Sequence, residues 1–354
     1  MHAEVFCLLR SFDVCLRPML KLAINGCGRI GRHALKLATE LDGLEIVAVN
    51  DLTDAATLAH LVRHDTVYRA FSKTVTSEEQ ALLIDGKRIP VYAEKDPSRL
   101  PWKELGVDVV LECTGRFTDR AGAEAHIHAG AKHVILSAPA KSDDIPTFVL
   151  GVNDAALTGK EDIVSNASCT TNSLAPVMAI MQGAFGIKKS LMTTVHSYTA
   201  SQVLQDGPSK DLREARAAAE NIVPTTTGAA KAVGRVLPSL KSTFDGLSIR
   251  VPTPVVSLSD CTLLLERSVT VEEVNHVFMQ AAESQAWQGV LSVTDEPLVS
   301  SDFIGNPASC IVDLSLTRVV DGDLVKVVAW YDNEWGYTNR LLELALLLGE
   351  RSQR

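Results

Sequence analysis

The 354-residue sequence lacks an excess of positive charge, since 43 aspartates and glutamates outnumber 34 lysines and arginines and the formal net charge is −9. This balance argues against a protein that binds nucleic acids or anionic membranes in general. No apolar run is long enough to span a bilayer. The seven cysteines are odd in number, scattered and without a C-x-x-C pair, which argues against a disulfide framework and a zinc site. We therefore expect a cytoplasmic protein with no metal and no nucleic-acid or membrane partner.

Residues 1–18 lack the continuous apolar core of a secretory signal, because Arg10, Asp13 and Arg17 interrupt their hydrophobic residues. Met19 stands immediately before the first predicted strand. We expect residues 1–18 to be a dispensable extension, and loss of folding or activity in a chain that begins at Met19 would contradict this. The remaining length exceeds one ordinary hydrophobic core, so two domains are expected.

The first half of the chain contains a glycine-rich turn between a predicted strand and a predicted helix, and Asp51 follows the next predicted strand. This order is typical of dinucleotide-binding folds. In such a fold Gly26 allows the tight turn, Gly28 lets the backbone approach a pyrophosphate, and Gly31 lets the helix pack closely on the strand. The N-terminus of the helix supplies N–H donors to the pyrophosphate. Asp51 would accept hydrogen bonds from the adenosine ribose and repel a 2′-phosphate, which favours NAD over NADP.

Further α/β units follow, with strands predicted at residues 107–112 and 133–136. Ligands of open parallel sheets bind at the carboxyl ends of strands, so Thr114, Gly115 and Ser137 are expected to line the cofactor cleft. The histidines of this region show no metal-ligand spacing and are interpreted as surface or packing residues (His126, His128 and His133).

The second half begins with Ser-Cys-Thr-Thr-Asn at residues 168–172, followed by apolar residues at helical spacing. Ser168, or a threonine after it, is the predicted N-cap, which places Cys169 in the first turn of a helix. The helix dipole and unpaired N–H groups there favour a thiolate. Pro176 is expected to kink this helix or to delay its regular start. The alternative for any single cysteine is a buried structural residue.

Strands with few crossover helices dominate the rest, which predicts a mostly antiparallel α+β catalytic domain beside an α/β Rossmann domain. A strand leads to His196, a long polar loop spans about residues 200–220, and Thr227-Gly228 precedes an Ala-rich helix whose N-terminus suits an anion. A nucleotide-binding fold with a histidine and a cysteine that is favoured as a thiolate suggests aldehyde oxidation through a thioester. Cys169 would be the nucleophile, and His196 would hold it as a thiolate and act as the base.

Six motifs in order resemble the phosphorylating glyceraldehyde-3-phosphate dehydrogenases (type I), and the resemblance runs from about Met19 to Leu348. They are Asn-Gly-x-Gly-Arg-Ile-Gly-Arg (25–32), Ser-Cys-Thr-Thr-Asn (168–172), His-Ser-Tyr-Thr (196–199), Thr-Gly-Ala-Ala-Lys-Ala (227–232), Arg-Val-Pro-Thr-Pro (250–254) and Trp-Tyr-Asp-Asn-Glu-Trp-Gly-Tyr (330–337). The resemblance implies a homotetramer, with an NAD-binding Rossmann domain at 19–168 and 334–354 and a catalytic domain at 169–333. The loop at 200–220 would correspond to the S-shaped subunit-contact loop of the family.

The same resemblance implies a role for each matching residue. Cys169 would be the nucleophile, His196 its base, and Thr199 and Arg250 the ligands of the substrate's C3 phosphate. The ligands of the attacking inorganic phosphate would be Ser168, Thr170, Thr227, Gly228 and again Arg250. The cofactor contacts matched in this way are Arg29, Ile30, Asp51, Lys95, Ser137 and Asn333, the last to the carboxamide of the cofactor.

Four positions depart from common family patterns. Cys27 replaces the usual Phe, and Lys95 replaces a common Arg; both changes are expected to be nearly neutral. Ser173 stands where many members have a second Cys, so a possible oxidation partner is lost. Glu214 stands where some members carry a phosphate-facing Arg, which puts phosphate affinity in doubt rather than activity.

Alternative functions remain open from the sequence. Asp51 together with Pro208 matches NAD-using members, although dual use of NADP stays open. Erythrose-4-phosphate dehydrogenase shares the Cys–His pair, but its segment after the catalytic His and its Thr-Gly-Ala-Ala motif differ from those seen here. A nucleotide-binding regulatory protein with vestigial chemistry is disfavoured by the intact Cys169, His196 and Arg250. Neither the direction of metabolic flux nor a secondary binding role is encoded by any motif.

Overall fold

The computed structural model describes residues 19–354, so the extension predicted at residues 1–18 lies outside the described residues. The chain divides into two compact units, each described by itself below. The first unit contains the described residues up to Pro146, with Leu157–Asn166 and Leu341–Arg354; the second contains Thr147–Ala156 and Ala167–Arg340. The boundaries predicted at residues 168 and 334 differ from these, and no sequence pattern indicated that residues 147–156 lie in the second unit.

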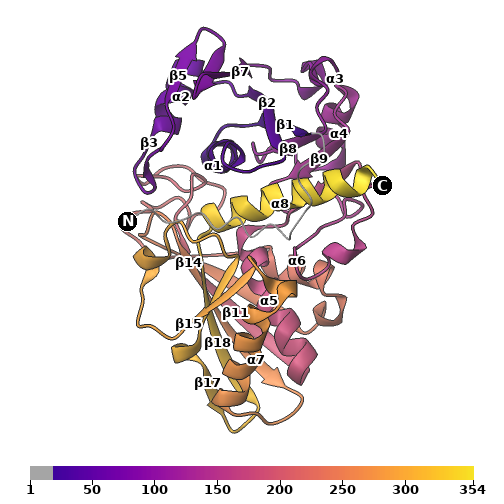
Figure 1. Ribbon diagram of the computed structural model, residues 1–354. Coiled ribbons are helices and arrows are strands. Elements are labelled where there is room, and N and C mark those ends of the chain that lie inside the picture. Colours follow the sequence, from indigo (N-terminus) through magenta and orange to yellow (C-terminus); the bar gives the residue numbers. More distant parts are fainter. Residues whose placement is uncertain (1–18) are drawn as a thin grey trace. The chain divides into compact units, whose positions relative to one another are not determined.

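The first unit is built on an eight-stranded sheet with the order β10-β9-β8-β1-β2-β7-β6-β5 (Figure 1). The pairings from β10 to β7 are parallel, and β6 and β5 extend the sheet as antiparallel strands. Every residue of β8, β9 and β10 is buried, as expected for parallel strands covered on both faces. The strands are β1 (Leu20–Asn25), β2 (Leu44–Asn50), β5 (Val75–Glu78), β6 (Ala81–Ile84), β7 (Lys87–Tyr92), β8 (Val109–Glu112), β9 (His133–Leu136) and β10 (Ile163–Ser165).

Apart from the C-terminal helix, the helices of this unit stand between strands of the parallel part of the sheet. Strand β1 lies between β2 and β8, so the strand order reverses beside β1. Ligands of such sheets bind at the carboxyl ends of the strands at this switch point. A small hairpin, β3 (His64–Asp65) with β4 (Arg69–Ala70), follows the second helix. The helices are α1 (Arg29–Ala38), α2 (Ala55–Arg63), α3 (Trp102–Leu105), α4 (Arg120–His128) and the last part of α8 (Trp335–Ser352).

The second unit contains a sheet with the order β12-β13-β11-β14-β18-β16-β15, to which β17 adds by pairing with β18. Five of its pairings are antiparallel, while β11 with β13 and β15 with β16 are parallel, so the predicted mostly antiparallel domain is confirmed. The strands are β11 (Ile187–Ser197), β12 (Val223–Thr225), β13 (Phe244–Val251), β14 (Ser257–Leu265), β15 (Leu291–Thr294), β16 (Cys310–Asp313), β17 (Arg318–Val320) and β18 (Leu324–Tyr331).

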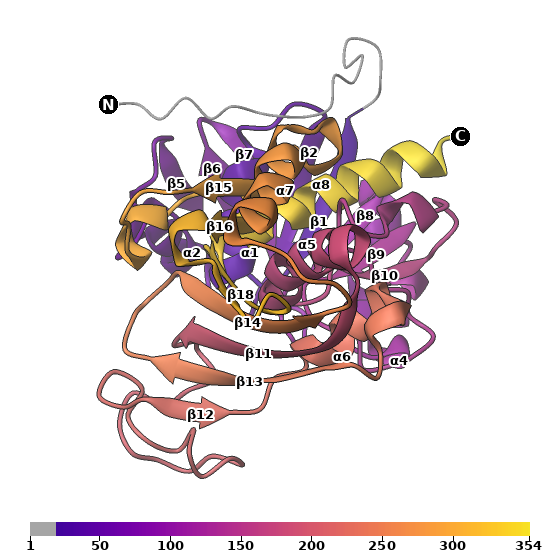
Figure 2. The ribbon, with the colours of Figure 1, turned by 90° about the horizontal axis from the view of Figure 1, so that it is seen from below.

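Three helices cover one face of this sheet (Figures 1 and 2). Helix α5 (Cys169–Phe185) packs against strands β11, β14, β16 and β18 and against both α6 (Ala229–Val236) and α7 (Val271–Glu283). Leu174, Val177, Met178 and Met181 of α5 are fully buried in the core cluster of the unit. Burial of this face stabilises a helix whose interior contains Pro176, and the helix begins at Cys169, without the delayed start allowed for from the sequence.

Helix α8 begins in the second unit and ends in the first. No helix within residues 19–354 combines the length and apolar character needed to cross a membrane.

Candidate active site

Cys169 is the first residue of helix α5, as predicted, and Ser168 is its N-cap. The Ser168 hydroxyl accepts a hydrogen bond from the backbone N–H of Thr171 at 3.0 Å. Ala167 before it has a positive φ of 56°, a conformation that non-glycine residues rarely adopt. The cap and this turn place the Cys169 sulfur at the positive end of the helix dipole.

His196 lies close to this sulfur, near the end of strand β11, with 3.5 Å between Cys169 Sγ and His196 Nε2. Strand β11 pairs in parallel with β13, and the register sets His196 beside Arg250. Arg250 Nη1 lies 2.5 Å from His196 Nδ1. The second unit therefore brings together three of the residues predicted to carry chemistry, the nucleophile, the base and one phosphate ligand.

The charges of this triplet favour a neutral Cys–His pair in the observed arrangement. Burial raises the pKa of the Cys169 thiol, although the Arg250 guanidinium opposes this shift. Burial, and then the Arg250 charge, lower the pKa of His196 to about 3, against the opposing influence of the Ser197 carbonyl. The thiolate–imidazolium ion pair expected from the sequence is therefore disfavoured while Arg250 contacts the imidazole, because a cation beside a histidine destabilises its protonated form.

Thr170 is buried, and its hydroxyl lies 3.0 Å from the Tyr331 hydroxyl. Tyr331 is also hydrogen-bonded to Thr194 at 2.8 Å, and its ring lies edge-on to His196 with 6.0 Å between centroids. Burial raises the pKa of Tyr331, so the phenol stays protonated. Sequence reasoning assigned Tyr331 no role, since its place within the Trp-Tyr-Asp-Asn motif does not reveal which strand it faces. The phenol therefore fixes the position of the Thr170 side chain.

Asn333, the predicted carboxamide contact, is nearly buried and held by two serines. Its Oδ1 accepts hydrogen bonds from Ser197 Oγ and Ser257 Oγ, each at 3.0 Å. Ser257 Oγ in turn accepts the backbone N–H of Ser197 at 3.1 Å. With the amide oxygen used in this way, the NH₂ group is the part of Asn333 that can bind a ligand. Ser257 follows Val256, a β-branched residue with a positive φ of 67°.

The remaining predicted phosphate ligands lie in the same unit, but their described hydrogen bonds are local. Thr199 Oγ1 lies 2.9 Å from Ser201 Oγ, and Thr227 Oγ1 accepts the backbone N–H of Ala229 at 3.1 Å. Gly228 is the N-cap of α6 and has no side chain to cap the helix, so beyond the Ala229 N–H bound by Thr227 no capping side chain in the described part of the chain meets the first turn. Among residues 19–354, Arg250 Nε is buried without a hydrogen-bond partner. Unused donors at a helix N-terminus and on a guanidinium suit a phosphate.

Glu214, one of the noted departures, lies in the long loop and accepts a hydrogen bond from Thr225 Oγ1 at 3.0 Å. Its carboxylate is therefore fixed two residues from Thr227, on the segment that leads into α6.

The first unit contains a cavity of about 610 Å³ at the carboxyl ends of β1, β2 and β8. The predicted cofactor residues among its lining are Gly26, Gly28, Asp51, Lys95 and Thr114. Arg29, Ile30, Gly31, Gly115 and Ser137 belong to the same unit but do not line this cavity, and Asn333 belongs to the second unit.

The glycines of the turn fit a dinucleotide for the predicted reasons. A Cβ added to Gly31 would lie 2.0 Å from the Gly26 carbonyl oxygen, so close helix–strand packing requires glycine there. Gly26 has a positive φ of 93°, and a Cβ on it would meet the Thr114 backbone at 2.8 Å. A Cβ on Gly28 would meet nothing within 4 Å, so the backbone at the N-terminus of α1 is open to a phosphate group.

Asp51 and Arg29 are both anchored within this unit. The Asp51 carboxylate accepts the backbone N–H groups of Cys27 at 2.7 Å and Thr53 at 2.9 Å, which aims it at the turn. Arg29 pairs with Asp65 at 2.5 Å instead of reaching freely into solvent. Although burial opposes ionisation, hydrogen bonds from Arg29 and from the backbone hold the pKa of Asp65 down to about 2. Arg29 is therefore held in a fixed ion pair.

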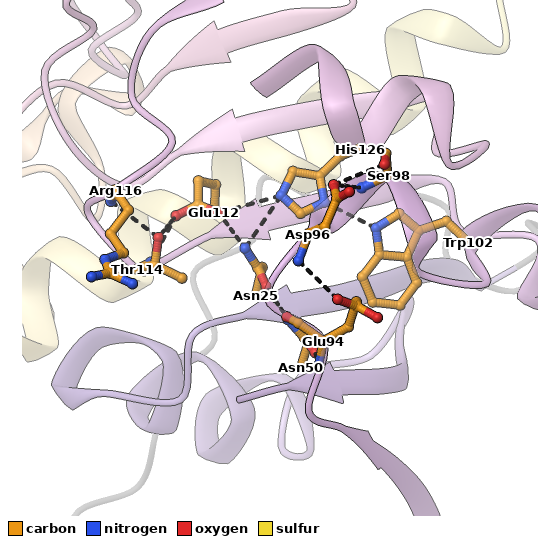
Figure 3. A network of polar contacts seen from close by, with 10 residues as sticks. All are labelled: Asn25, Asn50, Glu94, Asp96, Ser98, Trp102, Glu112, Thr114, Arg116 and His126. Atoms are coloured by element: carbon orange, nitrogen blue, oxygen red, sulfur yellow. Dashed lines mark hydrogen bonds and ion pairs between the residues drawn. The ribbon is translucent and has the colours of Figure 1, made fainter. Parts of the chain in front are cut away.

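A polar network that was not predicted from the sequence reaches from the wall of the cavity to buried residues beside it (Figure 3). Glu112, at the end of β8, accepts hydrogen bonds from Asn25 Nδ2 at 2.5 Å and from the backbone N–H and the hydroxyl of Thr114. His126 lies 3.3 Å from the same carboxylate and accepts a hydrogen bond from Trp102 Nε1 at 3.0 Å. An indole only donates, so His126 Nδ1 carries no proton and its Nε2 donates to Glu112. His126, interpreted from the sequence as a surface or packing residue, is fully buried and hydrogen-bonded.

Asn50 extends this network to the second strand. Its Nδ2 donates to Asn25 Oδ1 at 2.7 Å and to the Glu94 carbonyl at 2.9 Å, and its Oδ1 accepts the Glu94 N–H. The network therefore joins the carboxyl ends of β1, β2 and β8, and its members Asn25, Asn50 and Thr114 themselves line the cavity.

Within residues 19–354, no group of three or more His, Cys, Asp or Glu side chains is arranged to hold a metal ion. The five described cysteines are free thiols (Cys27, Cys113, Cys169, Cys261 and Cys310).

Comparison with known proteins identifies the family of the chain. Residues 20–120 match the family model "Glyceraldehyde 3-phosphate dehydrogenase, NAD binding domain", and residues 168–333 match "Glyceraldehyde 3-phosphate dehydrogenase, C-terminal domain". A glyceraldehyde-3-phosphate dehydrogenase of Kitasatospora aureofaciens is 54% identical over 335 residues, covering 94% of this chain and 100% of the relative. The glyceraldehyde-3-phosphate dehydrogenase of Geobacillus stearothermophilus is 52% identical, and glyceraldehyde-3-phosphate dehydrogenase 2 of Streptomyces avermitilis is 51% identical. Each match covers 94% of this chain and 99% of the relative.

Proposed function

The chain belongs to the glyceraldehyde-3-phosphate dehydrogenase family, and from this premise we propose that it oxidises D-glyceraldehyde 3-phosphate with NAD and inorganic phosphate to 1,3-bisphosphoglycerate. The observation that carries the proposal is the placement of Cys169 Sγ 3.5 Å from His196 Nε2, with Arg250 held beside the same imidazole by strand register. A nucleophile, a base and a phosphate-binding cation are the groups that this reaction requires.

The proposed mechanism starts with attack of the Cys169 sulfur on the aldehyde carbon. A C–S bond forms, the S–H proton passes by way of His196 to the carbonyl oxygen, and a hemithioacetal results. His196 Nε2 takes the hydroxyl proton as the hemithioacetal is oxidised to a thioester. Bound NAD supplies the hydride acceptor for this oxidation. An oxygen of inorganic phosphate then attacks the thioester carbon, the C–S bond breaks, and the electron pair returns to sulfur.

Two sets of donors would hold the phosphate groups of the reactants. Thr199 and Arg250 would bind the C3 phosphate, and the unpartnered Arg250 Nε supports this role. Ser168, Thr170, Thr227, Gly228 and Arg250 would bind the attacking phosphate, for which the N-terminus of α6, with a glycine at its N-cap, offers N–H donors.

NAD would be held by the residues around the cavity of the first unit. The N-terminus of α1 would bind the pyrophosphate, and Asp51, aimed by its two backbone hydrogen bonds, would bind the adenosine ribose. Lys95, Thr114, Gly115 and Ser137 would complete the pocket, and Asn333 would donate its NH₂ group to the carboxamide. The carboxylate of Asp51 disfavours the 2′-phosphate of NADP.

The test is NADH formation from glyceraldehyde 3-phosphate, measured with and without inorganic phosphate and repeated with NADP. Phosphate-dependent turnover with NAD supports the proposal. Turnover with NADP at least as fast as with NAD would assign the protein to the NADP-using relatives. Turnover with erythrose 4-phosphate alone would assign it to the second candidate activity.

We also propose a cytoplasmic homotetramer. The loop at residues 200–220 exposes Leu204 and Leu212, each 80% accessible, and Ile222 follows at 71%. Large apolar side chains gathered on one loop are typical of a protein–protein contact, which supports the subunit-contact role expected for this loop.

A further inference from the structure

His196 Nδ1 has two neighbours, of which one requires it to donate a hydrogen bond and the other requires it to accept one. The Ser197 carbonyl oxygen lies 2.7 Å away and can only accept a hydrogen bond, whereas Arg250 Nη1 lies 2.5 Å away and can only donate one. A proton on Nδ1 satisfies the carbonyl and is opposed by the guanidinium. A bare Nδ1 accepts from Arg250 instead. The two hydrogen bonds therefore exclude each other.

This choice decides what His196 presents to Cys169. A neutral imidazole carries one proton, so a hydrogen bond from Arg250 to Nδ1 places that proton on Nε2, which faces the sulfur at 3.5 Å. In this tautomer Nε2 is unable to accept a proton. When Nδ1 donates to Ser197, Nε2 has a free lone pair and can act as a base.

Arg250 has a reason to leave the imidazole when an anion arrives. Its Nε is buried and without a partner within residues 19–354, and its second contact, from Nη1 to the Ser197 carbonyl, is long at 3.3 Å. A guanidinium binds a phosphate through two parallel hydrogen bonds that are stronger than one bond to a neutral nitrogen. The Ser197 carbonyl is already in position to receive the Nδ1 proton once Arg250 moves.

We propose that a phosphate group bound by Arg250 switches the tautomer of His196 and so prepares it to act as the base for Cys169. The ring releases the Nε2 proton and takes one at Nδ1 from solvent, so its net charge is unchanged. The inference rests on the proposed function, since it takes Cys169 as the nucleophile and Arg250 as a phosphate ligand. It also gives specificity a physical origin, because an aldehyde without a phosphate would leave the histidine in its inactive tautomer.

The test reads the two ring nitrogens of His196 directly by NMR of protein labelled with ¹⁵N-histidine, with and without saturating inorganic phosphate. The His196→Gln variant identifies the signals by their loss. In the unsubstituted protein the proton is expected on Nε2 without phosphate and on Nδ1 with it. In Arg250→Met it is expected on Nδ1 in both samples. Arg267→Met, which removes a guanidinium paired with Glu273 in the same unit, is the matched control and should behave like the unsubstituted protein.

A proton found on Nδ1 without phosphate, or retained on Nε2 with phosphate, overturns the proposal. The comparison with and without phosphate is made on the unsubstituted protein, so it remains decisive if Arg250→Met fails to fold. Parallel assays of NADH formation separate the two proposals. Turnover without a change of tautomer contradicts the switch alone, whereas a change of tautomer without turnover contradicts the proposed function alone.

Discussion

Cys169 and the residues that line the dinucleotide cavity belong to different units of the chain. Replacing Cys169 with Ala is therefore expected to abolish NADH formation, since the thioester cannot form, while leaving the free energy of NAD binding within about 0.5 kcal/mol of its original value. Calorimetric titration with NAD beside a turnover assay provides the check. Loss of both properties would show that Cys169 is a structural residue.

In the proposed function, the choice between NAD and NADP depends on Asp51. Asp51→Ala removes a charged hydrogen-bond acceptor from the ribose site, so the dissociation constant for NAD should rise about tenfold or more, whereas NADP, which the carboxylate repels, should lose much less. Asp51→Asn is the comparison variant, because it removes the charge but keeps one of the two oxygens that accept the Cys27 and Thr53 N–H groups. Equal losses for both cofactors would refute this account.

The sequence predicted the setting of a residue where that setting depends on its neighbours along the chain. The Ser168 cap and the place of Cys169 at a helix start depend on adjacent residues, and the structure has both. The contact between Arg250 and His196 depends on the register of two strands far apart in sequence, which no local pattern encodes. The engagement of Thr170 by Tyr331 was hidden for the same reason.

Among the elements, the β3–β4 hairpin contains a local conflict. Arg69 has a φ of 66° and is exposed, so its backbone occupies a left-handed conformation that favours glycine. Arg69→Gly should raise the free energy of unfolding by about 0.5–1 kcal/mol, after allowance for the greater chain entropy of unfolded glycine. Arg69→Ala keeps the strained backbone and should give no gain in denaturant unfolding. Equal stability of both variants would place the effect in the arginine side chain instead.

The network that joins the ends of β1, β2 and β8 makes a second prediction at this scale. Both Glu112 oxygens accept hydrogen bonds, so the NH₂ group of a glutamine at this position would face donors (Figure 3). Glu112→Gln should lower the free energy of unfolding by about 1–3 kcal/mol. It should also weaken NAD binding, because Thr114 would be displaced. Glu94→Gln is the control, because its side chain accepts one exposed hydrogen bond. A stable Glu112→Gln variant with normal NAD affinity would contradict the positioning role of the network.

Sequence patterns predicted the classes of these elements better than their polar contacts. Alternation of strands and helices predicted the parallel sheet, and the scarcity of crossover helices predicted the antiparallel one. The interpretation of His126 as a surface or packing residue left its hydrogen bonds unpredicted, because the indole and the carboxylate that it meets come from other segments.

For the whole molecule, the proposed tetramer depends on the apolar side chains of the long loop. Leu204→Asp should release smaller species in analytical ultracentrifugation, since a carboxylate in a subunit contact would be desolvated without a partner. Leu61→Asp, at an exposed leucine of helix α2 in the first unit, is the control and should sediment like the unsubstituted protein. An unchanged mass for Leu204→Asp would remove this loop from the interface.

Helix α8 has a consequence for the order in which the protein is made. Its last turns belong to the first unit, where Gly349 lies against Leu20 of β1 and Arg351 donates to the Leu157 carbonyl. A ribosome delivers Leu20 long before Gly349, whereas residues 167–340 leave the exit tunnel as one continuous stretch. The first unit therefore remains incomplete until synthesis of the chain is nearly over. Until then its parallel strands stay exposed, and they are the part of the nascent chain most in need of a chaperone.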